Sequence, residues 1–383
     1  MVDDALLGLL VAFAVAAGLT PLVARLAIRV GAVDQPRARG LAEKATPLLG
    51  GLAIFAGAEV AGLLFLPLDD SRWQAVLVGA AVITIVGAVD DWRALPAAWK
   101  LAGELLAALV LVLSGTAVES FTLPFIGSVS LGSAGEPLTL LGLVAIMNAV
   151  NFTDGVDGLA AGVCAISAAA FAPIAFDLGR DDAGILACIT CGAAAGFLVH
   201  NFHPASVFMG DCGALLLGLL LGATIIEGSL KTNAVIALIV PLFVLAVPFM
   251  DTTFVVLKRV KYRRPVYRAD ANHFHHRFAR IGFSQRRTVA YLYAWTATMA
   301  GLAVALRFVP YSDDHGHFRA GPTALMAGLV VLALAASVYV VYTLEILKFK
   351  RFRMREAAPG TAEHEIDAQV EEELETGEFP TIR

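Results

Sequence analysis

The stretch NAVNFTDGVDGL, residues 148–159, decides the fold, because it places two amides and two carboxylates between apolar segments long enough to span a membrane. Its polar side chains recur at every third position: Asn148, Asn151, Asp154 and Asp157. Residues three apart on a helix lie side by side, so neighbours can share a ligand. The glycines of the stretch permit backbone that other residues resist, and they predict a helix end that opens into a tight loop. Ionisable groups at membrane depth are costly and usually mark a functional site, whereas the alternative is a solvated turn between helices.

The composition is that of an integral membrane protein. The chain has 383 residues, of which 58% are hydrophobic and 16% charged, and its mean hydropathy is +0.74. Soluble domains average about 25% charged residues, so this composition excludes a soluble globular protein. We predict an all-α polytopic fold with about eleven membrane-spanning helices. The expected spans are 4–30, 48–68, 73–90, 97–115, 137–150, 158–178, 183–200, 206–226, 233–258, 288–308 and 322–345.

The basic residues predict the orientation of these spans. Roughly 23 of the 28 Lys and Arg fall in alternate loops, which the positive-inside rule assigns to the cytoplasm. The N-terminus is then outside, the C-terminus is inside, and the protein is a multi-pass protein of the inner (plasma) membrane. Asp3 and Asp4, in place of a basic region, precede the first apolar run, so we expect that run to remain as a span and not to be cleaved as a signal peptide. Residues 1–350 form the expected membrane domain, and the charged tail 351–383 is expected to be disordered.

Three further patterns predict structural features to which no catalytic or binding role is assigned. Residues 119–132 alternate apolar and polar side chains, which favours a short β-hairpin on the outer side. Glycine pairs four residues apart predict close helix crossings, at 158 and 162, 192 and 196, and 218 and 222. Cys188 and Cys191 lie in an apolar segment, where small-residue packing is favoured over a metal or redox pair, and no structural disulfide is expected.

Two adjacent carboxylates, Asp90 and Asp91, end the third span, and Lys100 opens the fourth. Neighbouring residues on a helix point about 100° apart, so the two carboxylates should have different roles. One can face a metal or a reacting oxygen while the other orients a neighbour. The acidic pairs at 69–70 and 181–182 fall on the predicted outer side, where a solvated loop is a sufficient explanation.

A single carboxylate, Asp211, stands between two glycines at the cytoplasmic start of an otherwise uncharged span. This is a poor position for structure and a good one for a hard-cation ligand. The preceding His200 and His203 are interpreted as surface-loop residues in preference to metal ligands.

The first and last cytoplasmic loops carry cationic side chains. The first, around Lys44, mixes cations with Pro and Gly and suits a phosphate contact or a simple orientation signal. The last contains a cluster that we call the His cluster, composed of His273, His275, His276 and Arg277. A zinc site of this kind needs further Cys, His or carboxylate ligands, so contact with a sugar phosphate is favoured over zinc.

All these polar groups emerge at one face of the membrane once the spans alternate. A transporter would place ionisable groups near the middle of the bilayer, whereas this pattern suits the joining of a water-soluble anion to a membrane-held one. Mg²⁺ takes one or two carboxylates and completes its shell with water and substrate phosphates, so Asp211 and the loop at Asn151 are the natural ligands.

Five motifs in order resemble the polyprenyl-phosphate N-acetylhexosamine-1-phosphate transferases, of the glycosyltransferase family 4 type. They are NAVNFTDGVDGLAAG, VDDWR with Lys100, NFHPASVFMGDCG, PFMDT and DANHFHHRF. The resemblance runs from the first loop to the His cluster. The form of the last two motifs is similar to the branch that transfers N-acetylglucosamine 1-phosphate, and it is unlike the muramoyl-pentapeptide branch.

The resemblance implies a role for each matching residue. Asp211 would bind Mg²⁺, or Mn²⁺ in its place, with Asn151 nearby. Asp90 and Asp91 would serve the acceptor phosphate or its activation, and Asp154 and Asp157 the nucleotide side. The His cluster would contact the donor phosphate or sugar, while Lys44, Lys100 and Asn148 would bind substrate. The first loop departs from the family pattern at residues 39–42 and at Leu48, and Ala214 replaces a common Ser, which leaves the sugar open.

The reaction so implied transfers a HexNAc-1-phosphate from its UDP-sugar to an undecaprenyl- or decaprenyl-type phosphate and releases UMP, at the start of cell-envelope polysaccharide synthesis. Direct attack and an intermediate on an Asp are both compatible with these residues. The alternatives are a phospho-muramoyl-pentapeptide transferase, transfer of another UDP-sugar, a zinc-dependent membrane hydrolase, and a carrier of lipids or nucleotide sugars. A homodimer is one expected state, and no nucleic-acid partner is expected.

Overall fold

The computed structural model describes residues 2–35, 45–123, 127–230, 284–309, 319–335 and 337–338. The chain divides into two compact units, one of Met1–Phe249 with Tyr291–Val309 and the other of Met250–Ala290 with Pro310–Arg383. Several predictions fall outside the described residues: the span 233–258, the tail 351–383, Lys44, His273, His275, His276 and Arg277.

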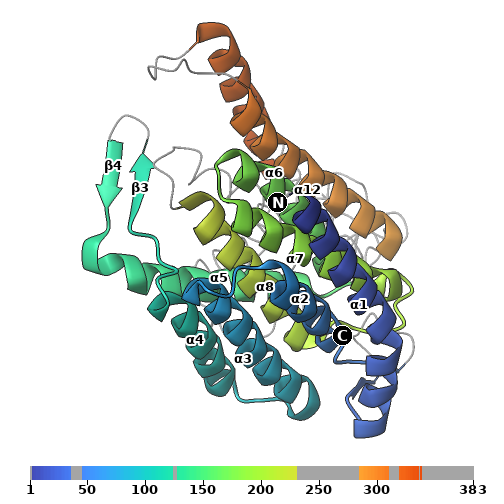
Figure 1. Cartoon of the computed structure of the whole chain (residues 1–383). Coiled ribbons are helices and arrows are strands. Elements are labelled where there is room, and N and C mark those ends of the chain that lie inside the picture. The colour runs from blue at the N-terminus through green and yellow to red at the C-terminus, as the bar shows by residue number, and fades with distance from the viewer. Residues whose placement is uncertain are drawn as a thin grey trace, which may run out of the picture. The chain divides into compact units, whose positions relative to one another are not determined.

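Helices dominate the described residues (Figure 1). In chain order they are α1 (Val2–Val30), α2 (Gly51–Phe65), α3 (Ser71–Arg93), α4 (Ala97–Leu113), α5 (Gly135–Thr153), α6 (Leu159–Asp177), α7 (Asp181–Asn201), α8 (Gly210–Ile225) and α12 (Gln285–Phe308). Short 3-10 and π-helical turns, Gly132–Ala134 and Ile226–Leu230, adjoin α5 and α8. Each predicted span between residues 4 and 226 corresponds to one of these helices, as does 288–308, with ends shifted by a few residues.

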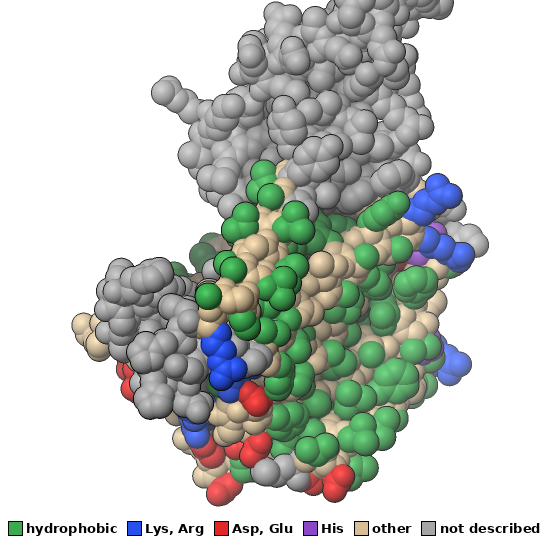
Figure 2. Space-filling model, turned by 90° about the horizontal axis from the view of Figure 1, so that it is seen from above, with side chains coloured by type: hydrophobic (Ala, Val, Ile, Leu, Met, Phe, Trp, Pro, Cys, Tyr) green, Lys and Arg blue, Asp and Glu red, His purple; other side chains and the backbone are tan. Residues whose placement is uncertain are grey.

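Seven helices of the described residues are long and apolar enough to cross a membrane, and two shorter apolar helices are Gly51–Phe65 and Ala320–Ala335. The chain is therefore a mostly helical membrane protein, as its composition predicts. Among the described residues, apolar side chains cover much of the face shown in Figure 2, as expected for helices that meet lipid. The full number of spans and their orientation stay predictions.

Helix α8 is the centre of the first unit. Almost all of its residues are buried, and it packs against α3 and α5 as well as against α2, α6 and α7. Two of the three predicted glycine crossings are confirmed: Gly192 and Gly196 of α7 lie against the backbone of α1 at Leu9 and Phe13, and Gly218 of α8 lies against Met147 of α5. A Cβ at any of these positions would overlap the neighbouring helix, so the glycines set the close spacing.

Two small antiparallel pairings connect the helices. β1 (Val33–Asp34) pairs with β2 (Thr46–Pro47) and brings the two ends of the first loop together. β3 (Ser120–Leu123) pairs with β4 (Gly127–Ser130), with Phe121 opposite Val129, within the range in which the sequence predicts a hairpin. The side of the membrane on which this pair lies stays a prediction.

Candidate active site

The last turn of α3 supplies the cap of α8. Asp91 accepts the backbone N–H of Asp211 through Oδ1 at 2.8 Å and that of Cys212 through Oδ2 at 3.1 Å. The first N–H groups of a helix have no partner within the helix, and a carboxylate also stabilises the positive end of the helix dipole. The contact requires glycine at two places, because a Cβ on Gly87 would overlap Cys212 and one on Gly210 would overlap the Asp91 carboxylate. Asp91 therefore fixes the start of α8 and, with it, the position of Asp211.

Asp90 shapes the turn between α3 and α4. Its Oδ1 accepts the backbone N–H of Leu95 at 2.6 Å, next to Ala94, whose φ of 49° reverses the chain. Its Oδ2 lies 3.4 Å from Nζ of Lys100. The two adjacent carboxylates thus make different contacts, as their angular separation on the helix predicts.

Lys100 lies at the centre of the site. Its ammonium pairs with Oδ2 of Asp211 and donates a hydrogen bond of 3.0 Å to the side-chain oxygen of Asn151. The amide nitrogen of Asn151 in turn donates to Oδ1 of Asp211 at 2.9 Å. Together with Asp90, these side chains come from α3, α4, α5 and α8, and the structure brings them together at one end of the bundle.

The tight loop predicted after Asn151 is confirmed. Helix α5 ends at Thr153, α6 begins at Leu159, and Gly158 has the positive φ of 77° that favours glycine. Asp154, at the end of α5, is partly buried. Burial, together with the charges of Asp211, Asp91 and Asp157, raises the pKa of its carboxyl group from 3.8 to about 8. Asp154 is thus close enough to Asp211 and Asp91 for their charges to act on its carboxyl group.

The other two residues of this series, Asn148 and Asp157, contact side chains other than Lys100 and Asp211. Oδ2 of Asp157 accepts a hydrogen bond of 3.0 Å from the backbone N–H of Ala205 and lies 2.8 Å from Nδ1 of His203. The amide of Asn148 donates to Glu104 at 2.5 Å. Asn148, Asn151 and Asp157 therefore make three different sets of contacts, since the helix on which the repeat begins ends at Thr153.

Sequence reasoning missed Glu104 and Tyr293. Glu104 is only 2% exposed on α4, although its sequence position is that of an ordinary helical residue. The hydroxyl group of Tyr293 on α12 donates a hydrogen bond of 2.5 Å to the carbonyl oxygen of Gly158. The tyrosine ring also fills the space beside Gly162. The predicted pair of Gly158 and Gly162 therefore accommodates a side chain of α12, whereas a close crossing of helix backbones was expected. No local sequence pattern signals either contact.

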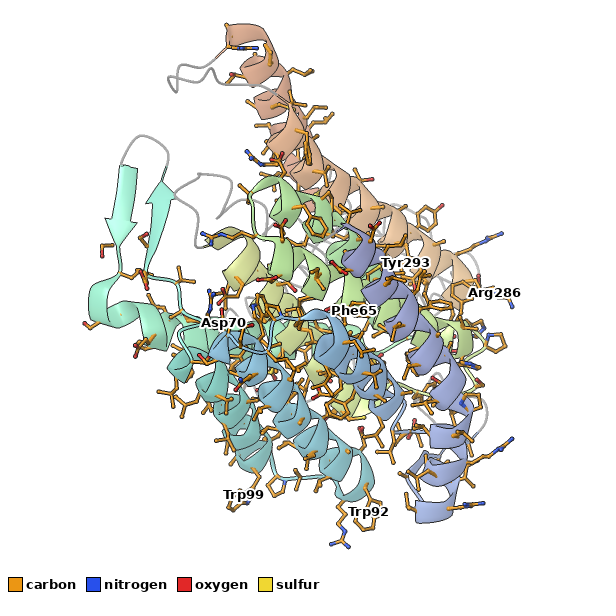
Figure 3. The ribbon with its side chains drawn as sticks, viewed as in Figure 1. Phe65, Asp70, Trp92, Trp99, Arg286 and Tyr293 are labelled. Atoms are coloured by element: carbon orange, nitrogen blue, oxygen red, sulfur yellow. The ribbon has the colours of Figure 1, made fainter. Side chains whose placement is uncertain are left out.

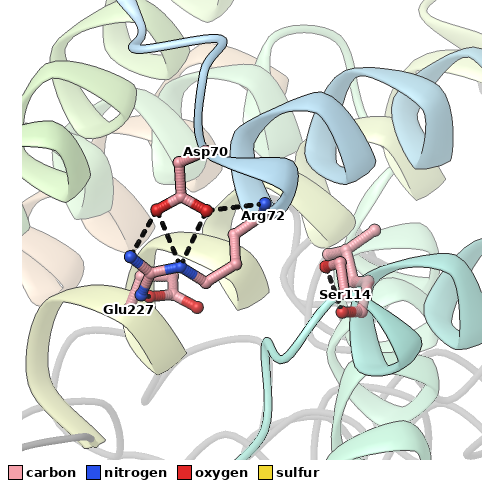
Figure 4. Close-up of polar contacts among 5 residues, drawn as sticks. Asp70, Arg72, Ser114 and Glu227 are labelled. Atoms are coloured by element: carbon pink, nitrogen blue, oxygen red, sulfur yellow. Dashed lines mark hydrogen bonds and ion pairs between the residues drawn. The ribbon is translucent and has the colours of Figure 1, made fainter.

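A second ion network lies at the opposite end of α3 and α8 (Figure 4). Asp70 accepts the backbone N–H of Arg72 at 2.9 Å and pairs with its guanidinium group at 2.5 Å, and Arg72 pairs at 2.9 Å with Glu227, which is 3% exposed. The sequence predicts a solvated loop at Asp70. The structure differs, because Asp70 caps α3 and, through Arg72, helps neutralise a buried carboxylate.

Two tryptophans flank the α3–α4 turn (Figure 3). Trp92 is 48% exposed, donates through Nε1 to the carbonyl oxygen of Val30 at 3.0 Å, and carries the Arg93 guanidinium group 4.1 Å from its ring centre. Trp99 is 70% exposed. Exposed tryptophans are typical of the boundary between membrane and water, and these two lie at the same end of α3 and α4 as Asp90, Asp91 and Lys100.

The donor set at this end suits a magnesium ion. Within the part of the chain that the structure describes, no three His, Cys, Asp or Glu side chains are grouped so as to hold a metal by themselves. Mg²⁺ needs only one or two protein carboxylates, because water and substrate phosphates complete its shell. The Lys100 ammonium beside Asp90 and Asp211 shows that these carboxylates are placed to neutralise a cation.

The chain is similar in sequence to known transferases. Residues 73–229 match the model of the family described as Glycosyl transferase family 4. A probable undecaprenyl-phosphate N-acetylglucosaminyl 1-phosphate transferase of Bacillus subtilis is 38% identical over 299 residues, which cover 76% of this chain and 83% of the relative. A decaprenyl-phosphate N-acetylglucosaminephosphotransferase of Mycolicibacterium smegmatis is 37% identical over 80% of this chain and 81% of the relative.

A phospho-N-acetylmuramoyl-pentapeptide-transferase of Desulforudis audaxviator is less similar, at 34% identity over 77% of this chain and 94% of the relative. The matched residues include Asp90, Asp91, Lys100, Asn151 and Asp211, so the family assignment and the site refer to the same part of the chain. This chain therefore belongs to glycosyl transferase family 4, together with the polyprenyl-phosphate N-acetylglucosamine-1-phosphate transferases that its sequence resembles.

Proposed function

We propose that the protein transfers N-acetylglucosamine 1-phosphate from UDP-N-acetylglucosamine to a polyprenyl phosphate and releases UMP. The observation that carries the proposal is the convergence of Asp90, Lys100, Asn151 and Asp211 from four helices at one end of the bundle. Relatives named for this transfer cover more than three quarters of the chain. We assign the reaction to the transferase domain of residues 1–350 and to the cytoplasmic face of the inner membrane, where the positive-inside rule puts this end.

In the proposed reaction, a phosphate oxygen of the polyprenyl phosphate attacks the β-phosphorus of the UDP-sugar. The bond from that phosphorus to the bridging oxygen breaks, and the electron pair leaves with UMP. Two anions must meet, so the site has to neutralise phosphate charge. We assign this role to Lys100, whose ammonium lies among the carboxylates and the amide of the site.

Asp211 and Asn151 are the residues that would hold Mg²⁺, with Mn²⁺ as a substitute. When bound, the ion would neutralise the pyrophosphate as the leaving group departs. We assign the nucleotide side to Asp154 and Asp157. The His cluster and Lys44 remain proposed substrate contacts on sequence grounds alone.

We propose direct attack by the acceptor, without an aspartyl intermediate. Both oxygens of Asp91 accept backbone N–H groups, and Oδ1 of Asp90 accepts that of Leu95. Carboxylates engaged in this way are poor nucleophiles. A polyprenyl phosphate is already ionised near neutral pH, so attack needs no strong base.

The test uses the purified full-length protein with polyprenyl phosphate, Mg²⁺ and a panel of UDP-sugars, scored for UMP and for the lipid-linked sugar. We expect UDP-N-acetylglucosamine to give both products, and Asp211→Ala to abolish both. Products from UDP-MurNAc-pentapeptide alone would instead assign the muramoyl branch. Zinc-dependent hydrolysis without a lipid-linked sugar, or transport without cleavage, would overturn the proposal.

A further inference from the structure

A second polar pair lies one helical turn along from the site. Glu104 follows Lys100 by four residues on α4, and Asn148 precedes Asn151 by three residues on α5. Such spacings place each residue on the same face as its partner in the site. Across the α4–α5 contact, Glu104 meets Asn148 just as Lys100 meets Asn151. The two contacts are successive steps along the same pair of helices.

The Glu104 carboxylate is buried and hydrogen bonded. It is 2% exposed, and its Oε2 accepts the side-chain amide of Asn148 at 2.5 Å. The same amide nitrogen donates to the carbonyl oxygen of Val144 at 3.0 Å, so both amide hydrogens have acceptors. A buried carboxylate is costly unless such bonds offset the loss of water.

The polar contact is confined to the turn next to the site. The following buried positions of α4 are apolar: Ala107, Ala108, Leu111 and Val112. Apolar side chains thus hold the rest of this helix, and packing alone does not require a carboxylate at Glu104. A directional hydrogen bond beside the site instead indicates that the rotation of α5 about its axis is important for the site.

We propose that Glu104 and Asn148 are positioning residues for the transfer reaction. Their hydrogen bond fixes the rotation of α5 about its axis and thereby holds the amide of Asn151 between Lys100 and Asp211. This inference rests on the proposed function, and it replaces the expectation that Asn148 contacts substrate.

An exchange of the two side chains tests the proposal. Asn148→Asp places two carboxylates together, and we expect kcat to fall by about tenfold or more while KM for UDP-N-acetylglucosamine changes by less than about threefold. Glu104→Gln still accepts the amide of Asn148, and we expect kcat within about threefold of the unmodified protein. In the double variant, the amide introduced at position 104 donates to the carboxylate introduced at position 148, so activity should return to a similar level.

A second readout does not depend on turnover. The rise of the thermal midpoint with added Mg²⁺ measures occupancy of the ion, and the half-saturating Mg²⁺ concentration should increase in Asn148→Asp and recover in the double variant. Thr139→Val is the matched control, because Thr139 is a buried, hydrogen-bonded residue at the other end of α5. It should lower the thermal midpoint without changing kcat.

Three results distinguish the possibilities. A double variant as inactive as Asn148→Asp would overturn the positioning role and return Asn148 to substrate contact. A tenfold loss in Glu104→Gln alone, on the same scale as Asn148→Asp, would also contradict it. Absence of UMP release by the unmodified protein would instead contradict the proposed function itself.

Discussion

The carboxylate of Asp91, at the end of α3, accepts the backbone N–H of Asp211, at the start of α8, over 2.8 Å. The residue expected to hold the metal is thus positioned by a carboxylate that lies 120 residues earlier in the chain. An acidic side chain that accepts two N–H groups of a helix terminus stabilises that terminus and fixes its direction. The adjacent Asp90 bonds to the α3–α4 turn and to Lys100 instead.

Replacement of these two aspartates should separate their roles. Asp91→Ala removes both acceptors from the start of α8, and we expect a loss of about 1–2 kcal/mol of stability together with loss of activity. Asp90→Ala should abolish activity with a smaller fall in the thermal midpoint, because α8 keeps its cap. Thermal unfolding in detergent, with UMP release on the same samples, measures both effects. Equal midpoints for the two variants would count against the capping role.

Glycine at position 210 should be indispensable. Its φ is 71°, and a Cβ there would overlap the Asp91 carboxylate. Gly210→Ala should therefore lower the thermal midpoint and reduce activity. Gly142→Ala is the control, because nothing lies near a Cβ at that position on α5 and Ala favours a helix by about 0.5–1 kcal/mol. The control should be as stable as the unmodified protein or more so.

The pH dependence of stability should report on Asp154. Its pKa is raised from 3.8 to about 8 in the folded state, so folding favours the neutral carboxyl group. The stability that this group contributes is present at low pH and is lost as the pH rises through about 8. In metal-free buffer, Asp154→Asn should therefore gain stability relative to the unmodified protein as the pH rises from about 5.5 to about 8.5. A constant difference in thermal midpoint across this range would contradict the assignment.

The ion network at the far end should affect stability but not catalysis. Arg72→Met removes one charged partner of the buried Glu227 carboxylate and should cost on the order of 2 kcal/mol, since Arg72 is itself about one-third exposed. Addition of Glu227→Gln should recover part of this loss, because no charge then remains to be neutralised. Both variants should keep kcat. A lower kcat in correctly folded Arg72→Met would show that this end of α3 communicates with the site.

The sequence alone determined the membrane class, the position of the described spans, the helix end and tight loop after Asn151, and the family. These properties depend on local composition, short-range spacing and motif order, all of which can be read along the chain. The tertiary structure decided which contacts each acidic residue makes. Asp91 caps α8, Glu104 supports Asn148, and Arg72 connects Asp70 to Glu227. These contacts join residues on different helices, and a hydrophobicity pattern records which face of a helix is apolar without recording which neighbour that face meets.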